Sequence, residues 1–139
     1  MTVYISALMR QPDTKKEVAM DVSLLGRVVR SKSRRLRDTF YHIVGFCLDG
    51  QYLLCSPKRH TVVSCPPDMF ALCDDMALTP VGFVKCGCRV CIVDDNGVYE
   101  VHHIVPHRNL VYLTRFQKFN FPFPVRPVEI IKIFNPVKD

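Results

Sequence analysis

The sequence contains no tryptophan, only six glycines in 139 residues, and no apolar run of the about 18 residues that a membrane-spanning helix needs. Its first residues do not combine a positively charged segment with an apolar one, so we expect neither a secretory signal nor a membrane span. Internal repeats and low-complexity linkers are also absent from the sequence. These absences predict a single domain over residues 1–139 of a cytoplasmic protein, with the nucleus as the alternative location.

Acidic residues are outnumbered, since 19 lysines and arginines face 13 aspartates and glutamates and the net charge is +6. This balance favours acidic partners such as nucleic acid. A basic loop is predicted over residues 27–38, where cationic side chains are concentrated. Such clusters bind phosphates and release counterions, whereas a loop that is merely solvated is the alternative. The candidate nucleic-acid-binding residues are Arg30, Lys32, Arg34, Arg35 and Arg37.

From residue 40 onward, short apolar runs are separated by turn-forming residues, which is typical of β-structure. The pairs Asp49-Gly50 and Asn96-Gly97 predict two-residue hairpin turns, because both pairs accept the positive φ angles of a type I′ turn. A further strand is predicted over residues 61–65, where two prolines follow and stop it. This part of the chain therefore predicts an antiparallel sheet.

Helices are expected in two places. Apolar residues spaced four, three and four apart predict a helix over residues 18–29, and a second short helix is predicted over residues 68–76. A strand over residues 2–9 and a turn over residues 11–16 precede them. The predicted fold class is α+β, a small domain dominated by antiparallel sheet, with one or two short helices and a stabilising zinc ion.

The zinc prediction comes from a cluster of cysteines and histidines in a predicted hairpin over residues 86–107. Seven cysteines, an odd number, in a chain without a secretory signal argue against disulfides. With a two-residue turn, Cys91 lies opposite His102, with the two Cβ atoms about 4.5–5.5 Å apart, and the pair can share a zinc ion. With a wider turn, Cys91 faces Glu100 or Val101. The candidate ligands are Cys86, Cys88, Cys91, His102 and His107. The alternative is that these cysteines pack in an ordinary core.

A catalytic interpretation starts from residues 101–106, which resemble the first half of the HNH nuclease motif. The resemblance implies that His103 is the general base and His102 a metal ligand. The spacer before Asn109 is too short for the loop of that family, and the closing metal-binding histidine is missing. We therefore predict that the protein is not an enzyme, and a metal-dependent nuclease is kept as the alternative.

The segment over residues 115–127 combines phenylalanines with basic residues. In an extended chain Phe119, Phe121 and Phe123 share one face, on which single-stranded bases can stack. The alternative is a strap that packs over the sheet. A protein-interaction module without any nucleic-acid role would use the same phenylalanines.

Three segments resemble the P1 proteins of sobemoviruses: residues 7–12 (Ala-Leu-Met-Arg-Gln-Pro), residues 83–91 with their cysteine knuckle, and residues 110–115 (Leu-Val-Tyr-Leu-Thr-Arg). The resemblance covers about a quarter of the chain. It implies suppression of host RNA silencing, support of virus movement, and zinc bound by Cys88 and Cys91. The first C-x2-C knuckle of that family is missing here, which puts a second zinc site in doubt.

The sequence thus predicts a non-enzymatic, zinc-stabilised viral accessory protein. We expect it to suppress host RNA silencing by binding RNA or a host silencing or defence protein, and to aid virus movement. Self-association into a homo-oligomer is an open alternative.

Overall fold

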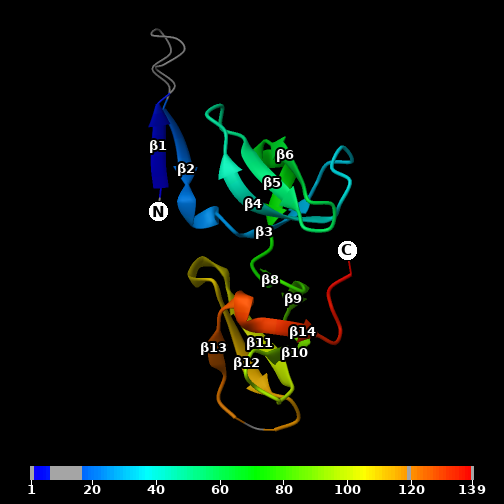
Figure 1. Cartoon of the computed structure of the whole chain (residues 1–139). Helices are drawn as coiled ribbons and strands as arrows, with labels where there is room; N and C mark the ends of the chain where they lie inside the picture. Colours follow the sequence, from blue (N-terminus) through cyan, green and yellow to red (C-terminus); the bar gives the residue numbers. More distant parts are fainter. Residues whose placement is uncertain (1, 7–16, 119, 139) are drawn as a thin grey trace. The chain divides into compact units, whose positions relative to one another are not determined.

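The computed structural model of the chain describes residues 2–6, 17–118 and 120–138. The chain forms two compact units, Met1–Leu72 (unit 1) and Cys73–Asp139 (unit 2). Figure 1 labels their strands along the sequence. The sequence predicts one domain over residues 1–139, and within it the structure distinguishes these two units, each with its own five-stranded sheet and its own core.

Unit 1 begins with an antiparallel pair, β1 (Thr2–Ser6) and β2 (Glu17–Asp21). A 3₁₀ turn, η1 (Val22–Leu24), follows, and the Asp21 carboxylate caps it by accepting a hydrogen bond from the Ser23 backbone N–H at 3.0 Å. The chain then enters strand β3 (Val28–Ser31).

The helix expected over residues 18–29 is therefore wrong. β-branched valines favour strands, and Gly26, at φ +81°, breaks any continuous helix. The turn expected over residues 11–16 lies outside the described residues, and so does the end of the strand expected over 2–9.

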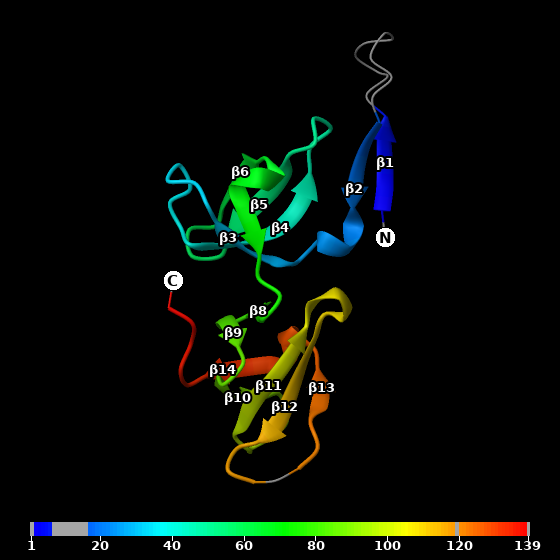
Figure 2. The ribbon, with the colours of Figure 1, turned by 180° about the vertical axis from the view of Figure 1, so that it is seen from behind.

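The five-stranded sheet of unit 1 has the order β6-β5-β4-β3-β7. Figure 2 labels β6, β5, β4 and β3. Its remaining strands are β4 (Phe40–Phe46), β5 (Tyr52–Ser56), β6 (Thr61–Cys65) and β7 (Phe70–Leu72). The predicted hairpin between β4 and β5 is present, but its loop is longer than two residues, because the Cys47 backbone N–H donates to Gln51 O at 2.8 Å. Gly50 supplies the left-handed conformation at φ +89°. The expected strand over residues 61–65 is confirmed.

The second expected helix, over residues 68–76, is also absent. Its first residues form the 3₁₀ turn η2 (Pro67–Met69), and the chain continues as strand β7. Tertiary packing explains the difference: Phe70 is buried, and its ring meets that of Tyr52 edge-on at 5.6 Å between centroids. A strand places Phe70 in the core and also pairs its backbone with β3.

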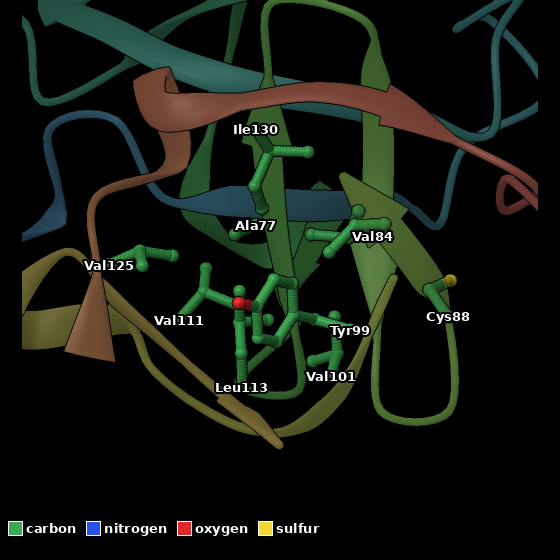
Figure 3. Close-up of a cluster of buried hydrophobic side chains, with 10 residues drawn as sticks. Ala77, Val84, Cys88, Tyr99, Val101, Val111, Leu113, Val125 and Ile130 are labelled. Carbon is green, nitrogen blue, oxygen red and sulfur yellow. The ribbon is translucent and has the colours of Figure 1, made fainter. Parts of the chain in front are cut away.

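Unit 2 contains the pair β8 (Met76–Thr79) and β9 (Gly82–Lys85) and a second five-stranded sheet of order β13-β12-β11-β10-β14. The strands of this sheet are β10 (Arg89–Ile92), β11 (Tyr99–Val105), β12 (Leu110–Arg115), β13 (Phe123–Val125) and β14 (Ile130–Ile133). The 3₁₀ turns η3 (Pro106–Arg108) and η4 (Pro127–Glu129) connect them. Side chains from β11, β12 and β14 converge around Tyr99 to form the core (Figure 3).

The sheet-dominated, antiparallel character predicted from the sequence is confirmed, because every strand pair recorded in both units is antiparallel. In the described residues, the helical segments are 3₁₀ turns of three residues each. No helix in that part of the chain has the length and apolar character needed to cross a membrane.

Candidate nucleic-acid interface

The hairpin that was expected to hold zinc has a different register from the predicted one. Val90 pairs with Tyr99 and Arg89 pairs with Glu100, whereas Cys91 pairs with Lys132 on the neighbouring strand β14. The expected pairing of Cys91 with His102 is therefore wrong, and so are the two wider registers considered.

The cause of this register is the turn. The Asp95 carboxylate accepts the Gly97 backbone N–H and the Tyr99 hydroxyl, both at 2.7 Å. These bonds close an Asx-type turn, with Asp94 in the left-handed region at φ +59°. Asn96-Gly97 consequently does not form the predicted two-residue turn, and the loop between β10 and β11 is longer.

Within the described residues, the other expected zinc ligands do not complete a set of three metal-binding side chains. Cys88 is buried in the core of unit 2, where its thiol donates to Asn135 O at 3.3 Å. Cys86 is exposed, and its thiol donates to the backbone oxygen of His102 at 3.1 Å. His107 is exposed on η3. Within residues 2–6, 17–118 and 120–138, no three His, Cys, Asp or Glu side chains are grouped so that they could hold a metal ion. The residues in place do not fit the zinc site, and zinc stays a prediction from the sequence.

The two adjacent histidines contact each other. The strand bulges between Val101 and His103, so His102 and His103 are both exposed. Their Nδ1 atoms are 2.7 Å apart, one donating to the other, and the His103 ring stacks on Tyr112 with 4.4 Å between centroids. The nuclease alternative stays a hypothesis from the sequence.

The aromatic segment does not form a single stacking face in the described residues. Phe123 packs edge-on against Tyr99 at 5.2 Å between centroids and contacts the core of unit 2. Phe121 is 85% exposed. Phe119 lies outside the described residues. The packing alternative thus holds for Phe123, whereas Phe121 faces solvent.

The basic loop of unit 1 is organised around a single acidic residue. Asp38 is only 6% exposed. One carboxylate oxygen accepts the Ser56 hydroxyl at 2.5 Å, and the other accepts Arg59 Nε at 3.1 Å. The backbone N–H of Asp38 donates to the Tyr41 hydroxyl at 3.0 Å, and its carbonyl accepts the Ser31 hydroxyl at 3.0 Å. These bonds fix the loop to the sheet and to the turn between β5 and β6.

The charge state of Asp38 follows from the same contacts. The hydrogen bond from Ser56 lowers the pKa of the Asp38 carboxyl below its usual value, and the hydrogen bond and positive charge of Arg59 lower it further, against the opposing effect of burial. Asp38 is consequently ionised at neutral pH and holds the Arg59 guanidinium in place.

A cavity of about 330 Å³ opens beside this network. We call it the basic pocket. Its lining residues are Arg35, Leu36, Arg37, Tyr41, Arg59, Thr61 and Val63. Two of the predicted nucleic-acid-binding residues, Arg35 and Arg37, therefore line one site. The other three, Arg30, Lys32 and Arg34, are exposed and do not line it.

Sequence reasoning missed Arg59. It lies 21 residues after Asp38 in the sequence, and the fold brings the two side chains together. The run Lys58-Arg59-His60 in the turn after β5 was the available signal, since it places two cationic side chains next to each other. Nothing in the sequence indicated that this turn and the basic loop share one pocket.

No protein-family model matches the chain, and no curated protein and no solved structure shows significant similarity to it. The resemblance to sobemovirus P1 proteins stays a prediction from the sequence.

Proposed function

We propose that the protein binds RNA, and that the basic pocket of unit 1 is its main phosphate contact. The observation that carries this proposal is the convergence of Arg35, Arg37 and Arg59 on one cavity. Arginine suits phosphate, because its planar fork of N–H donors can bind two phosphate oxygens at once.

The anchoring of Arg59 supports the same function. A guanidinium that is already oriented by a buried carboxylate loses less side-chain entropy when a phosphate binds. The bond to Asp38 uses Nε, so the two terminal nitrogens remain as a donor pair for a second anion. The overall charge of +6 adds attraction at long range.

Suppression of host RNA silencing is the biological role that we propose for this RNA binding. Two observations support this role: three sequence segments resemble sobemovirus P1 proteins, and the basic pocket is suited to binding phosphates. Binding to a host silencing or defence protein and support of virus movement belong to the same proposal and rest on the resemblance alone.

The test is the affinity of the full-length chain for RNA at several salt concentrations. The variant Arg35→Gln/Arg37→Gln/Arg59→Gln removes three positive charges from the basic pocket. The matched control Lys85→Gln/Arg108→Gln/Lys138→Gln removes three from exposed positions of unit 2. We expect the pocket variant to bind about tenfold or more weakly than the control, because each lost phosphate contact reduces counterion release. Its slope of log affinity against log salt should also be shallower.

Equal binding by the two triple variants would contradict the proposal, because it would show that net charge alone governs the affinity. Circular dichroism of both variants serves as the check that the sheets are intact.

A further inference from the structure

The basic pocket has apolar as well as charged walls. Leu36 and Val63 line it, and both also pack against the hydrophobic core of unit 1. Tyr41, which is 3% exposed, and Thr61 add hydroxyl groups. A bare phosphate ion makes no use of aliphatic surface, whereas a sugar or a base gains from covering it. The volume of about 330 Å³ lies at the small end of the range for ligand sites.

The charge of the pocket also distinguishes between kinds of phosphate. Three guanidinium groups line it, and the carboxylate of Asp38 offsets one of them through Arg59. Two positive charges then remain for a ligand. An internal phosphodiester of RNA carries a single negative charge, whereas a phosphate monoester carries about −1.5 to −2 at pH 7. The balance of the pocket matches the monoester.

The shape of the site points in the same direction. A phosphodiester backbone runs past a protein surface and is usually bound along a groove or a basic stripe. Two exposed arginines of the basic loop, Arg30 and Arg34, do not extend the lining of the pocket. A compact pocket fits the end of a strand better than its middle.

We infer that the basic pocket binds the phosphorylated terminal nucleotide of an RNA strand. The phosphate monoester lies against Arg35, Arg37 and Arg59, and the nucleoside covers Leu36 and Val63. This inference rests on the proposed function, because it names which part of the RNA the same pocket takes.

The experiment compares one single-stranded RNA sequence in three forms: with a 5′-phosphate, with a 3′-phosphate, and with hydroxyl groups at both ends. Affinities for the full-length chain are measured at one fixed salt concentration. We expect a phosphorylated end to bind about tenfold more tightly, the gain from one or two added charge-assisted hydrogen bonds. The form that gains identifies the end of the strand that enters the pocket.

Two variants test whether the basic pocket is responsible for the preference for phosphorylated RNA ends. Arg59→Gln should abolish the difference between phosphorylated and unphosphorylated RNA. Arg37→Gln should reduce this difference, and it leaves the bond between Asp38 and Arg59 in place, so it covers the case in which Arg59→Gln disturbs folding. The control Arg34→Gln changes an exposed arginine of the same loop that does not line the pocket. It should lower all affinities by the same factor.

The two levels of the proposal fail in different ways. Equal affinity of the unmodified protein for all three RNAs overturns the terminal-nucleotide inference, even when the triple pocket variant still weakens RNA binding. A preference for phosphorylated ends that survives both Arg59→Gln and Arg37→Gln also overturns it. Unchanged binding of every RNA by the triple pocket variant overturns the proposed function itself.

Discussion

Asp38 is an acidic side chain inside the most basic segment of the chain, and it is buried. Burying a carboxylate costs free energy unless hydrogen bonds and an opposite charge compensate for the lost hydration. Ser56 and Arg59 supply both. Asp38 thus connects the basic loop to the turn between β5 and β6, and it determines where Arg59 lies.

We predict that Asp38→Asn weakens both the fold of unit 1 and the binding of RNA. The amide keeps the shape of the side chain but loses the charge that holds Arg59, which should lower the free energy of unfolding by about 1–3 kcal/mol. RNA affinity should fall although the variant has lost a negative charge. Urea unfolding and RNA titration at fixed salt measure the two effects.

The matched control for this change is Asp49→Asn. Asp49 is exposed in the turn between β4 and β5, where its carboxylate accepts the Gln51 backbone N–H at 3.1 Å, and an amide oxygen can accept the same bond. We expect Asp49→Asn to keep full stability and to bind RNA slightly more tightly. A gain of affinity in Asp38→Asn as large as in Asp49→Asn would show that Arg59 needs no anchor.

His42 gives unit 1 a pH-dependent stability. Its Nδ1 atom is buried without a hydrogen-bond partner in the described residues, and burial lowers the pKa of the ring below 6.5. The folded chain therefore keeps His42 neutral at pH values where the unfolded chain is protonated. The free energy of unfolding should fall as the pH drops below 6.5, until the folded-state pKa is passed.

We predict that His42→Gln removes this contribution. The free energy of unfolding is measured between pH 7.5 and 5, and the curve of the variant should be flatter than that of the unmodified protein. The exposed His60 gives the control, as His60→Asn, because asparagine tolerates the left-handed conformation at φ +57°. Parallel curves for the unmodified protein and His42→Gln would contradict the assignment.

At the scale of elements, strand β10 determines where the side chains of the cysteine knuckle, Cys88 and Cys91, lie. Val90 on this strand is fully buried and Cys91 is only half-buried, as expected for neighbours that point to opposite faces of a sheet. Cys88, just before the strand, lies in the core. Cys88 and Cys91 have the sequence spacing of a zinc knuckle, but the thiol of Cys88 packs in the core and that of Cys91 lies on the other face of the sheet.

We predict different effects for the two cysteines. Cys88→Ala should lower the free energy of unfolding by about 1 kcal/mol or more, because it removes a packed sulfur and its bond to Asn135. Cys91→Ala should change the stability little. Urea unfolding with and without a chelator, together with native mass spectrometry, measures stability and metal content.

Shared zinc ligation would produce the opposite pattern. The native mass would then include one zinc ion, each substitution would remove it, and the chelator would destabilise the unmodified chain, because metal binding and folding are coupled. That result would restore the zinc site that the sequence predicted and would contradict the register of the hairpin.

At the scale of the whole molecule, the sequence shows an excess of positive charge but not its arrangement. The basic pocket assembles from a loop before β4, from β4 itself, and from β6 with the turn before it. Only a folded sheet brings these segments together. Two units with separate cores also explain why a chain of 139 residues carries two clusters of buried apolar side chains.

The sequence by itself determined the local features. Alternation of apolar residues, turn pairs and prolines predicted the hairpin of β4 and β5 and the strand β6 that follows it, because a side-chain period of two and a backbone break are local properties. The cationic run predicted Arg35 and Arg37 as binding residues. Each of these signals involves only a few neighbouring residues, so it can be recognised in a single segment of the sequence.

Tertiary structure decided everything that depends on partners distant in the sequence. Burial of Phe70 against Tyr52 replaced an expected helix with a strand. Cys91 on β10 pairs with Lys132 on β14, far away in the sequence, and not with His102. The hydrogen bond to Asp38 holds Arg59, 21 residues away in the sequence, beside the basic pocket. Each outcome depends on contacts that form only after folding has brought distant segments together, and a local sequence pattern contains no information about those contacts.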